Sequence, residues 1–212
     1  MDFHDAIQNF SELPLTKQIL LELLKKYKRP FDKIGELEKQ GVLLQIKRGL
    51  YVPGPKLKIS KPEPLLLANY LFGPSYVSLE TALSYWGLIP ERVYEITSVT
   101  TGPTKKYKTP VGRFIYIHME VPYYSFGIKQ IKLTKKQTVL MATPEKAVCD
   151  KIVATPGILL RSPKQVLELL VEDFRIEKQA LRNLSVIDIS NWINDAPKKS
   201  SLIMLAKTLN TL

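Results

Sequence analysis

The sequence predicts an α+β fold in two parts, and three observations lead to that prediction. Residues 1–54 hold three segments with helical periodicity, followed by two short apolar runs that meet at a glycine. Residues 65–212 hold helical segments, then runs rich in β-branched and aromatic residues, then helical patterns to the end. Residues 55–64 between them are rich in proline and lysine. We therefore predict an N-terminal domain at 1–54, a semi-rigid proline-rich linker at 55–64, and a mixed α+β domain with a small sheet and C-terminal helices at 65–212.

Three helices are expected in the N-terminal domain. A short one lies at 3–10, and a longer one spans 14–27, where leucines and an isoleucine recur at helical spacing and lysines gather near the end. The third opens at Pro30, because a missing N–H is harmless at the first helical position, and Gly41 ends it. Phe31, Ile34 and Leu37 would form its apolar face.

A β-hairpin should follow the third helix. Residues 42–46 and 50–52 are apolar runs, and Lys47, Arg48 and Gly49 form the corner, with glycine where a short loop needs a positive φ. Three helices followed by a small hairpin is the order of a winged helix-turn-helix. In that motif the third helix enters the major groove of DNA and the hairpin tip lies along the adjacent backbone.

Charge supports a nucleic-acid partner. The chain has 31 basic and 20 acidic residues, a net charge of +11, and residues 25–58 hold ten basic residues against three acidic ones, which is +7 of that excess. Because the third helix also carries acids, affinity should come from its flanks and the hairpin, and base reading from Lys33, Glu36, Lys39 or Gln40 on the face opposite Phe31. The candidate DNA-binding residues are Lys28, Arg29, Lys33, Lys39, Gln40, Lys47 and Arg48.

The second domain is expected to begin with helices at 65–72 and 78–86, with Pro74 to Ser78 able to form a strand that enters the second of them. Strands are expected at 96–100, 114–119, 126–133 and 139–141. Later helices start at Thr143, which caps Pro144, and at a Ser162 to Gln165 capping box, and two more cover 187–193 and 202–209.

A second basic surface is a further candidate. Its members lie between the predicted strands and could touch DNA, or nucleic acid held by a partner: Arg92, Lys105, Lys106, Lys108 and Arg113.

Catalytic chemistry has no signature in this sequence. There is no phosphate-binding glycine loop, no G-x-S-x-G, and no paired-carboxylate metal motif. One cysteine, Cys149, and two histidines cannot supply a structural zinc site, and Cys149 is expected to be inert core. We expect no enzyme activity, no cofactor and no metal. An acidic start and the lack of a long apolar run favour a cytoplasmic protein with no membrane segment.

Several short motifs in order along the chain resemble one family. They are Arg48-Gly49-Leu50-Tyr51, Pro74 to Leu79 with Ala82 and Leu83, Gly87 to Glu91, the run Thr97 to Thr100, Thr109-Pro110-x-Gly112-x-Phe114-x-Tyr116-x-His118, and Pro144-Glu145-Lys146-Ala147-x-x-Asp150. Together, over about residues 14 to 155, they resemble the AbiEi family of antitoxins and transcriptional regulators. The resemblance implies a winged helix that binds inverted repeats in its own promoter. It also implies a second domain that counters a nucleotidyltransferase-like toxin in a type IV toxin-antitoxin system.

The leading hypothesis is thus a DNA-binding transcriptional repressor and antitoxin. Its partners would be double-stranded promoter DNA and a cognate nucleotidyltransferase-like toxin, and it would act as a monomer or weak dimer. The alternative is a protein-interaction module that docks a partner without binding DNA. A third hypothesis, a metal-dependent nuclease, predicts Mg²⁺-dependent cleavage.

Overall fold

The N-terminal part of the chain folds around its own small core. In the computed structural model, which describes residues 3–212, its elements are α1 (Phe3–Asn9), β1 (Leu15–Thr16), α2 (Lys17–Leu23), α3 (Pro30–Lys39), β2 (Leu43–Lys47) and β3 (Leu50–Pro53). The strands form an antiparallel sheet in the order β1-β3-β2. Ten buried side chains form the core: Phe3, Ile7, Leu15, Leu20, Leu24, Ile34, Leu37, Val42, Leu43 and Tyr51.

The prediction of one helix over 14–27 is wrong at both ends. Leu15 and Thr16 form a strand paired with Tyr51 and Leu50, and the Thr16 hydroxyl then caps α2 by accepting a hydrogen bond from the Ile19 N–H at 3.3 Å. The helix ends at Leu23, so the lysines at 25 and 26 follow it in turns. Leu15 is buried in the strand, and a buried leucine is equally compatible with the apolar face of a helix, so the spacing of Leu15 did not locate this boundary.

The third helix and the hairpin agree with the prediction. Pro30 occupies the first turn of α3, and Gly41, with a φ of +71°, follows its end. The hairpin turns at Gly49, which has a φ of +80°, and a bulge between Gln45 and Lys47 shifts the register.

The connection between the parts is held by contacts at both of its ends. Leu57 and Ile59 pack on the N-terminal core. The buried side chain of Gln137, in the loop between β8 and β9, accepts a hydrogen bond from the Glu63 N–H at 2.7 Å. Glu12 accepts a hydrogen bond from the Thr134 hydroxyl at 3.0 Å in the same loop. The extended stretch is thus fastened to both parts.

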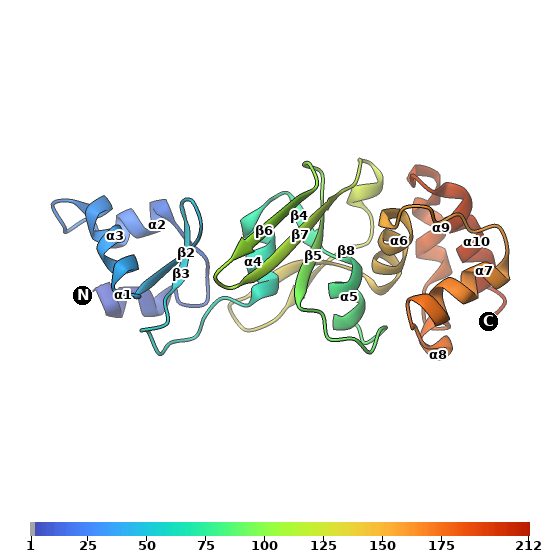
Figure 1. The fold of residues 1–212 in the computed structure, drawn as a ribbon, viewed down its shortest axis with the longest axis horizontal. Coiled ribbons are helices and arrows are strands. Elements are labelled where there is room, and N and C mark those ends of the chain that lie inside the picture. Colours follow the sequence, from blue (N-terminus) through green and yellow to red (C-terminus); the bar gives the residue numbers. More distant parts are fainter. Residues whose placement is uncertain (1–2) are drawn as a thin grey trace.

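The second part is a six-stranded mixed sheet with helices on both faces (Figure 1). The strands, in the order β6-β7-β5-β4-β9-β8, are β4 (Ser75–Val77), β5 (Glu95–Thr100), β6 (Lys105–Thr109), β7 (Gly112–His118), β8 (Ile128–Lys132) and β9 (Thr138–Ala142). The pairs β5–β7 and β4–β9 are parallel, and the others are antiparallel. Strand β6 is not predicted from the sequence, because an edge strand rich in lysine lacks apolar alternation.

The helices flanking the sheet are α4 (Pro64–Leu71) on one face and α5 (Leu79–Tyr85) and α6 (Pro144–Ala154) on the other. The Tyr116 hydroxyl donates to the Ala68 carbonyl of α4 at 2.6 Å. Tyr116 is paired with Ser98 of β5, so Thr97, the residue before Ser98, points to the opposite face of the sheet. There the Thr97 hydroxyl donates a hydrogen bond to the hydroxyl of Thr81 in α5. These helices and the cap at Thr143, whose hydroxyl accepts from the Lys146 N–H, confirm the predictions.

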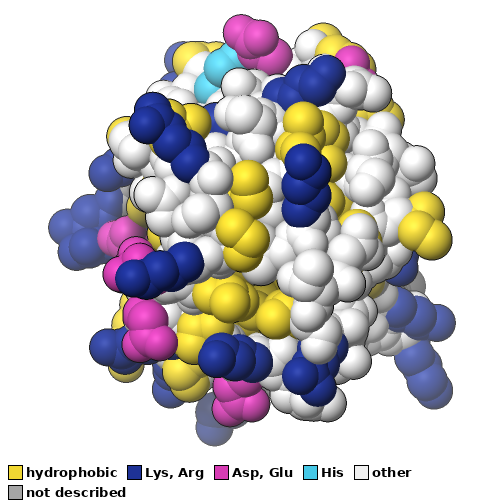
Figure 2. Space-filling model, turned by 90° about the vertical axis from the view of Figure 1, so that its right-hand side faces the viewer, with side chains coloured by type: hydrophobic (Ala, Val, Ile, Leu, Met, Phe, Trp, Pro, Cys, Tyr) yellow, Lys and Arg dark blue, Asp and Glu magenta, His cyan; other side chains and the backbone are white. Residues whose placement is uncertain are grey.

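The chain ends in a helical layer packed beyond α6, at the right of Figure 1. Its elements are α7 (Pro163–Leu167), a π-helix η2 (Glu168–Asp173), α8 (Lys178–Leu181), α9 (Val186–Trp192), a 3₁₀ turn η3 (Ile193–Asp195) and α10 (Lys199–Leu209). Another 3₁₀ turn, η1 (Tyr123–Ser125), lies between β7 and β8. Ser162 caps α7 as predicted, but Gln165 accepts from the Arg161 N–H and so does not return a bond to Ser162. At this end apolar side chains form a band among scattered lysines and arginines (Figure 2).

The protein is thus α+β, as predicted. Within residues 3–212, none of the helices combines the length and the apolar character needed to cross a membrane.

Candidate nucleic-acid interface

The exposed side of α3 carries polar side chains that bind one another. Lys33 Nζ lies 2.9 Å from Glu36 Oε1, and Gln40 Nε2 donates to the same oxygen at 2.8 Å. The hydrogen bond from Lys33 lowers the pKa of Glu36. Lys33 Nζ also lies 5.4 Å from the centroid of the Tyr27 ring. A base contact by Lys33 or Gln40 would therefore replace a bond that already exists within the helix.

The apolar face predicted for α3 is wrong at one position. Ile34 and Leu37 are buried, but the Phe31 side chain is 58% exposed. The small core closes over Ile34 and Leu37, and the first turn of α3 extends past it. Lys17 Nζ lies over the Phe31 ring at 4.5 Å from its centroid. An aromatic ring with a cation against it thus stands on the surface beside the start of α3.

Lys17 connects the start of α3 with the corner of the hairpin. Its backbone N–H donates to the Gly49 carbonyl at 2.9 Å, next to the exposed Arg48. Arg29 at the start of α3 lies 3.8 Å from Asp32, and both side chains are mostly exposed, so water screens this pair. We call this group the basic corner: Lys17, Lys28, Arg29 and Arg48, all exposed.

Lys39, the last residue of α3, is exposed but lies about nine residues, roughly 14 Å, further along the helix. The sequence prediction did not include Lys17, because its role depends on a contact with the hairpin. The Thr16 cap was the one local sign that could have placed this lysine at a helix start.

The side chain of Lys47 is directed to the second part of the molecule. Its Nζ donates to the Leu71 carbonyl at 3.0 Å and lies 5.9 Å from the centroid of the Tyr107 ring. Ile46 and Leu50 beside it are buried in the core of the second part. The hairpin thus packs between the two parts, and of its two predicted contacts only Arg48 belongs to the basic corner.

The second basic surface is divided between two faces of the sheet. Successive residues of a strand point to opposite faces, so Lys105 lies on one face and Lys106 and Lys108 on the other, where Lys108 is paired with Arg113. Lys105 Nζ lies 5.1 Å from the centroid of the Tyr107 ring, the ring that Lys47 also approaches. Lys105 is therefore the member that adjoins the hairpin.

The other members of this surface have partners on β5 and its approach. Arg113 Nη1 lies 3.1 Å from Glu95 Oε1 and donates a hydrogen bond to it. Arg92, in the loop before β5, lies with its Cζ 5.9 Å from the centroid of the exposed Tyr94 ring. The structure thus joins Lys105 to the N-terminal part and keeps Arg92, Lys106, Lys108 and Arg113 apart from it.

No protein-family model matches the chain, and no curated protein matches it.

The motif from Pro144 to Asp150 builds a buried polar cluster. Lys146 Nζ lies 2.8 Å from Asp150 Oδ1 and donates to the Tyr123 carbonyl at 3.0 Å, while Asp150 Oδ2 accepts from the hydroxyls of Tyr76 and Ser78 at 2.9 and 2.7 Å. The side chains of Lys146 and Asp150 are fully buried. Burial lowers the pKa of Lys146 and raises that of Tyr76 well above its ordinary value. This cluster ties α6 to the sheet and presents no charge at the surface.

Cys149 is buried in the same helix, as predicted, and burial raises the pKa of its thiol. In the part of the chain whose side chains the structure describes, no three His, Cys, Asp or Glu residues are grouped so that they could hold a metal ion.

Proposed function

We propose that this protein is a DNA-binding transcriptional repressor and antitoxin, and that residues 1–54 form a winged helix-turn-helix. The observation that carries the proposal is the basic corner. Four exposed cations lie where α2, the start of α3 and the hairpin meet, in a unit whose three helices precede a hairpin. Backbone N–H groups at a helix start favour phosphate as well.

In this proposal the basic corner binds phosphates and supplies most of the affinity. The exposed face of α3 carries Glu36 and Asp32 beside its lysines, so it would contribute selection of bases more than attraction. Lys33, Lys39 and Gln40 are the residues proposed to meet base edges, and Lys33 and Gln40 would exchange their bonds to Glu36 for bonds to DNA. Lys105 lies beside the hairpin and would extend the phosphate contact.

The antitoxin part of the proposal rests on the resemblance to the AbiEi family. It predicts that a nucleotidyltransferase-like reading frame adjoins this gene and that co-expression of the two restores growth. Inverted repeats need two copies of the chain, so light scattering with and without operator should detect a second copy on the DNA.

The test of DNA binding uses the full chain and a fluorescent duplex of its own upstream region, with a shuffled duplex as reference. Lys28→Ala with Arg29→Ala should reduce the slope of log affinity against log salt by about 2. Lys178→Ala with Arg182→Ala is the matched control, since it removes the same two residue types from exposed sites in and beside α8. It should leave the slope unchanged.

The hairpin gives a second, finer comparison. Arg48→Ala should reduce the salt slope by about 1, whereas Lys47→Ala should leave it unchanged, because the Lys47 ammonium is directed away from the basic corner, to the Leu71 carbonyl and the Tyr107 ring of the second part. An equal reduction of the salt slope by both changes would contradict the assignment of Arg48, and not Lys47, to the basic corner.

The alternative function, a module that docks a protein partner, has one observation in its favour. The hairpin is partly buried against the second part of the molecule, which leaves less of it to lie along DNA. That function predicts weak binding without preference for the upstream duplex.

A further inference from the structure

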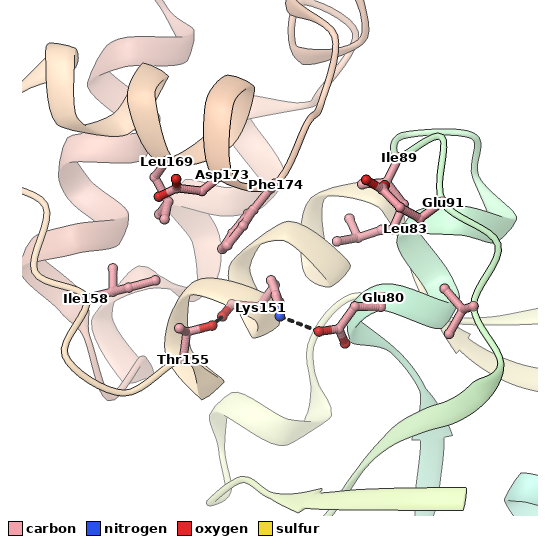
Figure 3. A pocket seen from close by; sticks show the side chains of 11 residues that line it. Glu80, Leu83, Ile89, Glu91, Lys151, Thr155, Ile158, Leu169, Asp173 and Phe174 are labelled. Atoms are coloured by element: carbon pink, nitrogen blue, oxygen red, sulfur yellow. Dashed lines mark hydrogen bonds and ion pairs between the residues drawn. The ribbon is translucent and has the colours of Figure 1, made fainter. Parts of the chain in front are cut away.

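A cavity of about 490 Å³ lies between the sheet domain and the C-terminal helical layer (Figure 3). One wall comes from α5, α6 and the loop before β5, and the other from residues 155–174. Its lining includes Glu80, Leu83, Lys151, Leu169, Asp173 and Phe174. The volume falls in the range of small-molecule sites. The elements α6 and η2, which carry several of its lining residues, lie toward the end of the molecule away from α3 (Figure 1).

The cavity is mainly apolar and contains one aromatic side chain. Leu83 and Ile89 line it from the α5 side, and Ile158 and Leu169 from the other, and the Phe174 side chain points between these walls (Figure 3). An apolar cavity with a few charged groups is the usual composition of a site for an organic molecule.

The charged groups on its walls are mostly carboxylates, although the chain as a whole carries +11. Lys151 forms an ion pair with Glu80, and its Nζ lies 5.4 Å from the centroid of the Phe174 ring. The cavity therefore already holds one ammonium between a carboxylate and an aromatic ring. Glu91 is paired with Arg175 at 3.0 Å. Asp173 is the remaining carboxylate, and no cation among the described residues forms an ion pair with it.

The backbone around the cavity is irregular at three places. Leu79 and Arg175, with φ values of 55° and 56°, are the residues other than glycine that have a positive φ in the described chain. Each directly adjoins a lining residue, Glu80 in one case and Phe174 in the other. Leu169 and Asp173 belong to the π-helix η2, a rare form that often occurs at functional sites. Unfavourable backbone conformations of this kind tend to persist at ligand sites.

We propose that this cavity binds an organic cation that has an apolar body and a single ammonium group. The body would lie against Leu83, Leu169 and Phe174. The ammonium would bind the Asp173 carboxylate, which has no cation of its own, while Lys151 stays on Glu80. The proposal is independent of DNA binding.

The experiment is calorimetric titration of the full chain with three probes of equal length, 4-phenylbutylamine, 4-phenylbutanol and 4-phenylbutanoate, up to about 5 mM. Asp173 is exposed, so water screens its charge, and the amine should bind about twofold to fivefold more tightly than the alcohol, with the carboxylate binding most weakly. Ile158→Trp, or Thr155→Trp on the same wall, should abolish binding of all three by filling the cavity.

Asp173→Asn should reduce the affinity for the amine to that for the alcohol and leave the alcohol unaffected. Glu172→Gln is the matched control, because this neighbour on η2 is exposed as Asp173 is but does not line the cavity. The proposal is overturned if the alcohol binds as well as the amine, if the control weakens the amine as much as Asp173→Asn does, or if no probe binds saturably.

Discussion

Two helices in different parts of this molecule carry the same local feature, a lysine bound to an acid one turn later. In α3 the pair is Lys33 with Glu36, at 2.9 Å, and the two side chains are 22% and 51% exposed. In α6 the pair is Lys146 with Asp150, at 2.8 Å, and both side chains are fully buried. The distances are nearly equal, so the difference between the pairs lies in their surroundings.

Water reaches the pair in α3, screens its attraction and can replace either partner, so the pair contributes little to stability. The pair in α6 has lost its hydration, and its charges are compensated only by protein groups, including the hydroxyls of Tyr76 and Ser78 and the carbonyl of Tyr123. The comparison teaches that an exposed pair is available to a ligand, whereas a buried pair is part of the fold.

The largest predicted effect breaks the buried pair. Asp150→Asn should lower the free energy of unfolding by about 3 to 5 kcal/mol, because it leaves the Lys146 ammonium buried without its counter-charge. Glu36→Gln, the equivalent change in α3, should leave the urea unfolding midpoint essentially unchanged. Urea unfolding followed by circular dichroism measures both, and equal effects would refute the distinction between the pairs.

A smaller effect applies the same distinction to apolar residues of α3. Ile34→Ala should cost about 2 to 4 kcal/mol of unfolding free energy, because Ile34 is buried in the N-terminal core. Phe31→Ala removes a larger side chain but should cost less than about 1 kcal/mol, since the ring is mostly exposed and packs against Lys17. Unfolding of the two variants side by side checks this order, and a reversed order would restore the apolar face predicted from the sequence.

The smallest effect concerns pH and the tyrosines beside the two pairs. Burial raises the pKa of Tyr76, so above about pH 10 it keeps its proton in the folded state while the unfolded chain loses it. The unfolded state then binds fewer protons, and stability falls as pH rises, by up to about 1.4 kcal/mol per pH unit for each such tyrosine. Tyr76→Phe should reduce that slope by this amount.

Tyr27→Phe is the control for the pH experiment, because Tyr27 lies beside the exposed pair and is 40% exposed. Urea midpoints between about pH 9 and pH 11 give the slopes. Identical slopes for the two variants would mean that Tyr76 titrates as it does in the unfolded chain.

Local signals in the sequence were sufficient for much of the fold. Proline at a first turn, glycine after a helix and threonine or serine caps act over four residues or fewer, so α3, α6 and α7 were predicted near their true starts. The start of α2 was not, because Leu15 and Thr16 pair with Tyr51 and Leu50 of β3, which lie far along the chain. Strand β6 was missed for a different reason, because this lysine-rich edge strand shows no apolar alternation.

The candidate interface was predicted only in its composition. The concentration of charge between residues 25 and 58 is a property of the sequence, and Lys28, Arg29 and Arg48 are exposed as a DNA contact would require. The sequence could not indicate that Lys47 binds the Leu71 carbonyl or that Lys17 joins the corner. Both depend on which segments meet in space.

By itself, the sequence determined the α+β class, most helix ends and the excess of positive charge, because caps, periodicity and residue type are local properties. Only the tertiary structure decided which charges are free, which ring is exposed, and that residues within 80–93 and 151–174 line one cavity. Burial depends on contacts between distant segments. Two lysine–acid pairs of similar length therefore differ, because one meets solvent and the other is enclosed in the core.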